Sequence, residues 1–209
     1  MTPFVTLLLT FLVAIVPIVE LKLAIPLGMG LAENAGITGM SPWYYFIAAF
    51  LGTCIPTVLI LLYLKPVLAW LGRTKAFSGL ANKLNAHFEK KAKKVELKAE
   101  ARAERVKERA LRKHADKEWT EEELVALTQK TERRRNRSLE FVKYLSLFMF
   151  VAVPLPLTGV WTGSAIAVFL NTKMKYSLPC IIIGNLTAGL IVMFLSLAGF
   201  NLAGITIPI

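Results

Sequence analysis

Two charged residues, Glu20 and Lys22, lie in a stretch of chain that is otherwise apolar, residues 16–28 (VPIVELKLAIPLG). A carboxylate inside a membrane can exchange protons or bind a cation, and a neighbouring ammonium can tune it. Pro17 and Pro26 bracket the pair, and each proline removes a helical hydrogen bond. We therefore predict that the turn between the two prolines holds Glu20 and Lys22 in a central polar pocket.

An alternative is that the charged pair lies at the membrane surface as an interfacial anchor. Residues 4–19 are free of charge, and a helix of that length rises roughly 24 Å against a hydrocarbon core of about 30 Å. Glu20 can therefore lie anywhere from the middle of the membrane to the far headgroups. We favour the central position.

A second proline-broken stretch, residues 153–163 (VPLPLTGVWTG), has no ionisable group. Its hydroxyl groups, freed carbonyls and flat indole ring can bind a polar or cationic group. Close helix packing through small residues is the alternative. The predicted substrate contacts are Pro17, Pro26, Pro154, Pro156, Thr158, Gly159, Trp161, Thr162 and, on a later helix, Asn185.

Five apolar runs must position these residues. Residues 4–19, 23–31, 43–64, 144–172 and 176–209 contain no Asp, Glu, Lys or Arg. About 20 apolar residues in a helix cross a bilayer core. The sequence therefore predicts an all-α integral membrane protein.

The charge is concentrated in the middle of the chain, where residues 72–137 hold 20 of the 25 Lys and Arg and 11 of the 14 Asp and Glu. Basic loops favour the cytoplasmic side, so we predict that residues 72–139 form a basic cytoplasmic insert. Apolar residues recur every three or four positions, which indicates two antiparallel helices joined near residues 113–119. Thr120 and Glu123 have capping-box spacing at the start of the second helix. Acids interleave with the bases, so we expect a solvated surface and no nucleic-acid partner.

The two ends of the chain resemble each other. Each has a proline-broken run followed by a long apolar run, and Gly52-Thr53 in one half matches Gly184-Asn185 in the other. This weak symmetry predicts two inverted repeats, residues 1–71 and 140–209. Each repeat is expected to contain a re-entrant hairpin (residues 4–31 and 141–170) and a transmembrane helix (residues 43–71 and 176–200).

Four plain membrane spans are the other topology. The connector 171–176 carries Lys173 and Lys175, and it would lie outside with plain spans but inside with re-entrant hairpins. The tendency of basic loops to face the cytoplasm therefore favours the hairpins, with both termini outside. We expect a multi-pass protein of the plasma membrane.

We expect no enzyme activity from the membrane part. Residues 1–31 and 141–209 together contain one glutamate and neither histidine nor aspartate. Those residues offer no nucleophile–base pair and no cluster of metal ligands. We therefore expect no catalytic residues, no metal and no cofactor.

The motifs PIVELKLAIPLG and PLPLTGVWTG resemble the small multi-drug export protein family, itself similar to the DedA/VTT superfamily. The resemblance covers residues 10–75 and 140–200. It implies facing re-entrant hairpins and transport of small molecules or lipid-linked substrates, with proton coupling as an option. The positions that match the family's motifs are Pro17, Glu20, Lys22, Pro26, Gly28, Pro154, Pro156, Thr158, Gly159, Trp161, Thr162 and Gly163.

Three functions remain open at this point. The leading hypothesis is a secondary transporter with its site between the hairpins, coupled through Glu20 and tuned by Lys22. The alternatives are a flippase for a lipid or lipid carrier, and a non-transporting scaffold whose insert recruits a partner. Membrane lipids, a small-molecule or lipid-linked substrate and protons are the expected partners. A homodimer is compatible with the sequence, although no residue argues for it.

Overall fold

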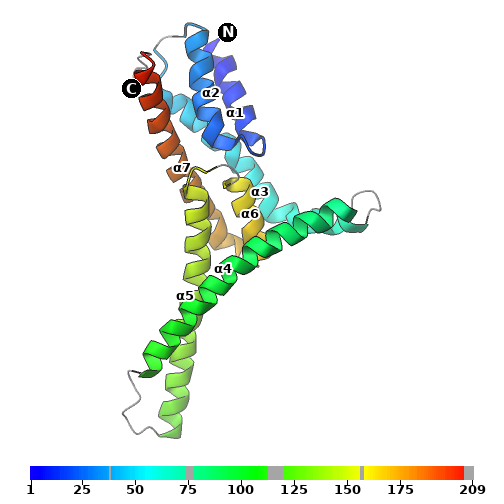
Figure 1. The fold of residues 1–209 in the computed structure, drawn as a ribbon, viewed down its shortest axis with the longest axis vertical. Helices are drawn as coiled ribbons and strands as arrows, with labels where there is room; N and C mark the ends of the chain where they lie inside the picture. The colour runs from blue at the N-terminus through cyan, green and yellow to red at the C-terminus, as the bar shows by residue number, and fades with distance from the viewer. Residues whose placement is uncertain (38, 74–77, 113–119, 156–157, 205–209) are drawn as a thin grey trace.

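The described part of the chain is entirely helical. The computed structural model describes residues 1–37, 39–73, 78–112, 120–155 and 158–204. These residues form seven helices and no strand (Figure 1), which confirms the predicted all-α class. The helices are α1 (Pro3–Ile15), α2 (Glu20–Asn34), α3 (Pro42–Arg73), α4 (Ser78–Arg112), α5 (Glu121–Ala152), α6 (Val160–Phe169) and α7 (Met174–Leu202).

Two of the described helices, α3 and α7, are long and apolar enough to cross a membrane. Their apolar lengths, Pro42–Trp70 and Met174–Leu202, are 29 residues each with a mean hydropathy of 2.3. A helix of that length rises roughly 44 Å, more than the hydrocarbon core requires. The helices α1 and α6 are also apolar but have only 13 and 10 residues, which is too short for a straight crossing.

Two helical hairpins approach each other in the middle of the molecule. The first consists of α1 and α2, joined by residues 16–19, and the second of the end of α5 and α6, joined by residues 153–159. Figure 1 shows the hairpins coming from opposite ends, with their turns meeting beside α3 and α7. Contacts in the described residues follow a similar pattern in both halves: α1 packs on α3 and α5 on α7, while α2 and α6 each pack on both α3 and α7.

Glycines allow the first arm of each hairpin to approach its long helix closely. A Cβ atom on Gly52 in α3 would overlap the carbonyl oxygen of Phe11 in α1. A Cβ atom on Gly184 in α7 would lie 2.9 Å from the carbonyl oxygen of Phe148 in α5. The Gly-Thr and Gly-Asn pairs matched in the sequence therefore occupy comparable packing positions.

A buried hydrogen bond joins the two long helices. The amide of Asn185 in α7 donates to the hydroxyl oxygen of Thr53 in α3 at 2.7 Å, and both residues are buried. Thr53 in turn donates to the carbonyl oxygen of Phe50 at 2.8 Å. Asn185 is one of the predicted substrate contacts, and in the structure its side chain links α7 to α3.

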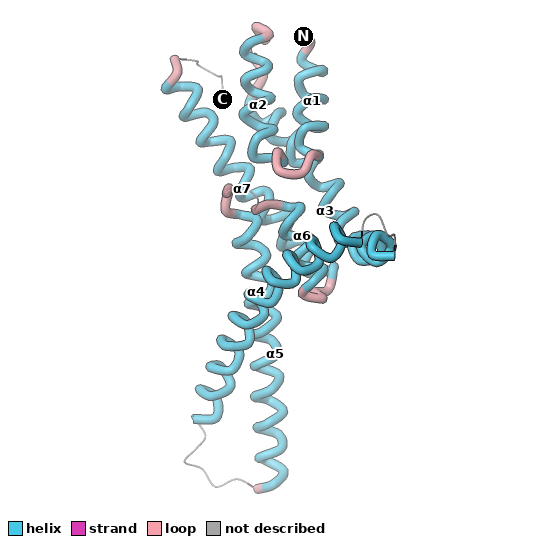
Figure 2. Tube along the Cα trace, turned by 45° about the vertical axis from the view of Figure 1, so that its right-hand side comes forward, coloured by secondary structure: helices cyan, strands magenta, loops and turns pink. Residues whose placement is uncertain are grey.

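The α4 and α5 helices form the predicted antiparallel pair, which projects away from the N-terminal end of the molecule (Figure 2). Ala92, Ala99 and Ala103 lie buried in α4. Thr120 and Glu123 form the predicted capping box at the start of α5. The predicted junction at residues 113–119 lies outside the described residues.

The helix α5 continues without a break through residue 139, where the insert was predicted to end. One helix therefore provides both the second arm of the exposed pair and the first arm of the second hairpin. The division of the chain at residues 71/72 and 139/140 stays a prediction.

One prediction about local structure is wrong: the turn that was expected to extend from Pro17 to Pro26 and to hold Glu20 and Lys22 is shorter. The turn occupies residues 16–19, and Pro26 lies inside α2, which runs from Glu20 to Asn34. Proline at this position removes the amide hydrogen that would bond the carbonyl of Lys22. Packing of α2 against α1, α3 and α7 compensates for the missing bond and holds the helix together. Glu20 and Lys22 therefore lie on the first turn of α2, after the turn and not within it.

Candidate functional site at the meeting point of the hairpins

The turn that leads into α2 has an unusual backbone. Ile18 has a φ angle of 80° and Glu20 a φ angle of 47°, both in the left-handed region. A β-branched residue is rare there because its Cβ atom crowds the backbone, and such residues cost about 1–3 kcal/mol each. The contacts of the neighbouring Glu20 and Lys22 hold this turn in place.

The Glu20 carboxylate caps the N-terminus of the helix α6. Its Oε1 atom accepts a hydrogen bond from the backbone N–H of Trp161 at 3.2 Å. Gly159, the N-cap residue of α6, has no side chain that could cap the helix. The first N–H groups of a helix carry partial positive charge and need acceptors. Glu20, which is only 6% exposed, supplies one from the other hairpin.

Lys22 binds oxygen atoms of the segment that precedes α6, residues 153–159. Its ammonium donates to the carbonyl oxygen of Leu155 at 3.0 Å and to the hydroxyl oxygen of Thr158 at 3.2 Å. Thr158 also donates to backbone carbonyl oxygens that follow the end of α5, those of Val153 and Leu155, each at 2.9 Å. The acid therefore meets backbone amides and the base meets backbone carbonyls.

Gly159 is required by space and not by its backbone angles. Its φ angle of −179° is extended and open to any residue. A Cβ atom at this position would overlap the carboxylate of Glu20. A residue with a side chain would therefore displace the carboxylate from the helix terminus.

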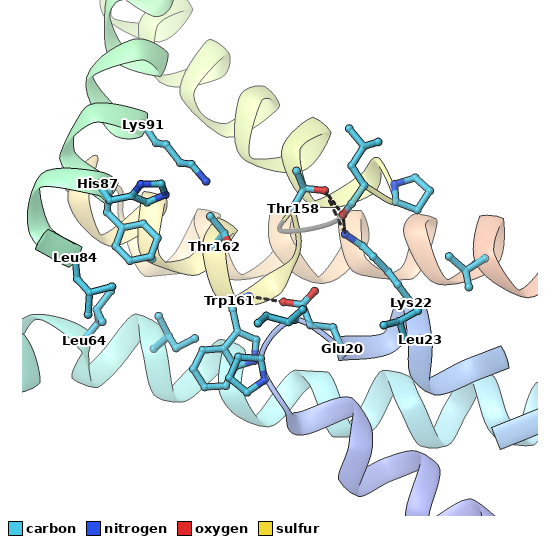
Figure 3. A pocket seen from close by; sticks show the side chains of 18 residues that line it. Glu20, Lys22, Leu23, Leu64, Leu84, His87, Lys91, Thr158, Trp161 and Thr162 are labelled. Atoms are coloured by element: carbon cyan, nitrogen blue, oxygen red, sulfur yellow. Dashed lines mark hydrogen bonds between the residues drawn. The ribbon is translucent and has the colours of Figure 1, made fainter. Parts of the chain in front are cut away.

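A cavity of about 800 Å³ lies beside these contacts (Figure 3). Most of its walls are apolar, and its lining comes from α2, α3, α4, α6, α7 and the two turns. The lining residues are Pro17, Ile18, Glu20, Lys22, Leu23, Ile60, Leu64, Leu84, His87, Phe88, Lys91, Pro154, Leu155, Thr158, Trp161, Thr162, Ala165 and Val192. A cavity of this size and composition can hold an organic molecule.

Most of the predicted site residues meet around this cavity. Seven of them line it: Pro17, Glu20, Lys22, Pro154, Thr158, Trp161 and Thr162. Gly159 lies against Glu20. Pro26 and Asn185 are not among the lining residues, and Pro156 lies outside the described residues.

The sequence prediction missed the wall that α4 provides. His87, Phe88 and Lys91 line the cavity from a helix that was expected to face solvent. The Phe88 ring stacks on Phe169 of α6, with ring centroids 5.8 Å apart. The apolar stripe of the insert was the available signal, because such a stripe needs a surface to cover.

The described residues contain no cluster of three or more His, Cys, Asp or Glu side chains that could hold a metal ion. The side chains that line the cavity supply one carboxylate, two ammonium groups, an imidazole, hydroxyl groups and aromatic rings. Such groups bind and orient molecules by charge, hydrogen bonding and ring contact.

The described residues are entirely helical, and the two long apolar helices α3 and α7 are typical of an integral membrane protein. The family model described as "Putative small multi-drug export protein" matches residues 20–191. The chain belongs to this family, as its motifs indicated. Comparison with curated proteins and with solved structures found no match.

Proposed function

We propose that the protein is a secondary transporter that exports small molecules through a site between two re-entrant hairpins. The observation that carries this proposal is the cavity of about 800 Å³ beside the meeting point of the two hairpins. Membership of a family described by small multi-drug export supports the same function.

The lengths of the helices support re-entrant hairpins. The 13 residues of α1 rise roughly 20 Å, which is less than the hydrocarbon core of about 30 Å. Broken backbone at membrane depth is tolerated where protein or a wet cavity surrounds it. Both hairpin turns adjoin the cavity, so part of each turn borders the cavity and not lipid.

The matching contacts of the two halves support inverted repeats. The first arm of each hairpin packs on the long helix of its own half, α1 on α3 and α5 on α7, and the second arms, α2 and α6, each pack on both long helices. In this proposal residues 72–139 face the cytoplasm and both termini face outward across the plasma membrane. Opposed halves of this kind allow a central site to open to either side in turn.

Glu20 is the proposed coupling residue because it is the only carboxylate that lines the cavity among the described residues. It holds α6 through the amide of Trp161, while Lys22 holds the segment before α6. A change in the charge of Glu20 would weaken its contact with the positive end of α6. Proton uptake could in this way loosen one hairpin from the other.

The test is dye efflux from proteoliposomes containing the full chain. Liposomes are loaded with ethidium, a polyaromatic cation, or with carboxyfluorescein, an anion, and a pH gradient is applied. We expect the protein to accelerate the efflux of at least one dye, with a rate that depends on the gradient. Glu20→Gln keeps a neutral acceptor for the Trp161 amide but removes the charge, and should lower the gradient-dependent rate at least about ten-fold.

The matched control is Glu33→Gln, which changes an exposed acid near the end of the same helix. This variant should transport as the parent protein does. Efflux of both dyes at the rate of protein-free liposomes would contradict small-molecule export. Gradient-dependent efflux that survives Glu20→Gln would contradict the coupling role alone.

A flippase for lipids is the second candidate, favoured by the mostly apolar walls of the cavity. It is distinguished by a separate measurement on the same liposomes. A fluorescent phospholipid in the inner leaflet becomes accessible to an impermeant quencher only if the protein moves it across. Fast quencher access without dye efflux would replace small-molecule export by lipid transfer.

A further inference from the structure

The α4 wall of the cavity bears on the chemistry of the substrate. We propose that the cavity binds an amphiphilic organic anion, with its acidic group at Lys91 and His87 and its apolar body along Trp161 and Phe88. The proposal rests on the transport function proposed above and names the substrate class for the same site.

Lys91 supplies a positive charge that is not balanced locally. It lines the cavity, and Figure 3 shows its ammonium directed toward Thr162. The ammonium lies 5.6 Å from the centre of the Phe150 ring. Within the described part of the chain, no carboxylate forms an ion pair with Lys91.

The charges of the hairpins do not balance Lys91. Glu20 is held by the backbone amide of Trp161, and Lys22 is held by Leu155 and Thr158. Since Glu20 and Lys22 have opposite charges, they offset each other. The lining side chains then leave one net positive charge, that of Lys91, when His87 is neutral.

An unbalanced ammonium beside apolar walls favours a ligand that brings its own negative charge. His87 lies on the same face of α4, four positions before Lys91, and offers a hydrogen-bond donor to the same group. The indole N–H of Trp161 is buried without a hydrogen-bond partner among the described residues, so a further donor lies beside the cavity. A cation would meet the ammonium instead, which argues against the cationic substrate that the indole ring alone suggests.

The volume of the cavity limits the size of the ligand's apolar body. A volume of about 800 Å³ is enough for a polycyclic or long-chain organic acid. Phe88 and Trp161 give it two aromatic contacts, while Leu64 and Leu84 extend the apolar wall. The acidic group can be a carboxylate or a phosphate monoester, since both suit an ammonium.

The experiment measures binding to the full chain in nonionic detergent by energy transfer from tryptophan to pyrene. The probes share one body: pyrenebutanoate, its uncharged amide and the corresponding trimethylammonium compound. We expect pyrenebutanoate to bind at least about ten-fold more tightly than the amide, which corresponds to roughly 1.4 kcal/mol. The trimethylammonium probe should bind most weakly.

The decisive variant is Lys91→Gln, with Lys94→Gln as its matched control. Lys94 is an exposed lysine on the same helix that does not line the cavity. Lys91→Gln should bring the affinity for pyrenebutanoate close to that for the amide and leave amide binding unchanged, whereas Lys94→Gln should change neither. Lys91→Arg should keep the preference for the anion. A pyrenebutyl phosphate probe distinguishes the two acids, since tighter binding than pyrenebutanoate assigns the site to phosphate monoesters and weaker binding assigns it to carboxylates.

Equal affinity for pyrenebutanoate and the amide would overturn the proposal. So would equal losses in Lys91→Gln and Lys94→Gln, because they would mean that general surface charge attracts the probe. Anion binding that depends on Lys91, in a protein that moves no dye, would keep this inference and remove the transport proposal. Export of ethidium without any preference for pyrenebutanoate would keep transport and remove this inference.

Discussion

The contact between Glu20 and the Trp161 amide joins the two hairpins where they meet. The sequence identified Glu20, Lys22 and the segment around Trp161 as parts of one pocket, because charges and prolines are rare in apolar runs. It did not identify the partner of each charge. Knowing that partner requires the register between hairpins more than 130 residues apart in the chain, which no local pattern contains.

Gly159 offers a direct test of this contact. We expect Gly159→Ala to destabilise the protein by about 1–3 kcal/mol, because the added Cβ atom would overlap the Glu20 carboxylate. The measurement is the thermal unfolding midpoint of the full chain in detergent. Gly199→Ala is the control, since nothing lies within 4 Å of a Cβ atom on Gly199.

The steric origin of the effect can be checked with a second substitution. Glu20→Ala removes the carboxylate and leaves room for a methyl group at position 159. In the Glu20→Ala background, Gly159→Ala should therefore cost much less than it does in the parent protein. Equal costs in both backgrounds would show that the overlap with Glu20 is not the cause.

At the scale of helices, close approach between a hairpin arm and its long helix is set by glycine. The sequence revealed the Gly52 and Gly184 match, but it could not say which helix each glycine faces. That information depends on how the hairpins fold back. The sequence likewise could not show which helix Asn185 faces. Its amide donates a hydrogen bond to Thr53, and Asn185 is not among the residues that line the cavity.

We expect Gly52→Ala to lower stability by about 1–3 kcal/mol, because its Cβ atom would overlap the carbonyl oxygen of Phe11, which belongs to rigid helical backbone. Gly184→Ala should cost less, since its closest contact, at 2.9 Å, is less severe. Thermal unfolding in detergent gives both values. If the Gly52→Ala variant were as stable as the Gly199→Ala variant, tight packing of α1 on α3 would be ruled out.

The α4–α5 pair should respond to pH through Lys107 and Glu132, which form an ion pair of 2.8 Å. The pKa of the Glu132 carboxyl is lowered chiefly by the hydrogen bond from Lys107. The pKa of the Lys107 ammonium is raised chiefly by the same bond. The contribution of Glu132 is therefore present above its ordinary pKa of 4.5 and is lost as the pH falls through its lower folded value.

Lys107 behaves in the opposite sense. Its contribution is present below its ordinary pKa of 10.5 and is lost as the pH rises through its higher folded value. We expect the distance distribution between spin labels at Arg112 and Glu122 to stay narrow between these limits and to broaden in acid. Double electron–electron resonance spectroscopy of the spin-labelled full chain measures this distance distribution.

Glu132→Gln separates this pair from the other acids of the insert. The variant should show a broader distribution already at neutral pH and a smaller change in acid. Glu108→Gln removes an acid of α4, the helix that carries Lys107, and this acid forms no described ion pair with Lys107. The Glu108→Gln variant should behave as the parent protein. Identical acid responses in the parent and Glu132→Gln proteins would exclude the pair as the pH-sensitive contact.

At the scale of the whole molecule, the charge segregation predicted the order of the parts well. The apolar runs marked α3 and α7 as candidate spans, and the charged middle marked the α4–α5 pair. The sequence placed a boundary at residue 139 because most of the charged residues lie before it. Helix geometry does not respond to that change in composition, so α5 continues to Ala152.

The proposed topology predicts opposite accessibility for two loops. In a variant without Cys54 and Cys180, single cysteines at Asn34 and Thr172 should react with an impermeant maleimide from opposite sides of the membrane. Asn34 should be labelled from outside and Thr172 from the cytoplasm, because the halves are inverted in the proposal. Labelling of both positions from the same side would indicate plain spans.

The uninterrupted helix α5 has a mechanical consequence. Its 32 residues extend roughly 48 Å from the capping box at Thr120 to the turn that contains Pro154 and Leu155. Because no proline or glycine provides a joint along it, a tilt at the exposed end must reappear at the turn that receives the ammonium of Lys22. The helix thus acts as a lever through which a force on the protruding arm would pull on the wall of the cavity.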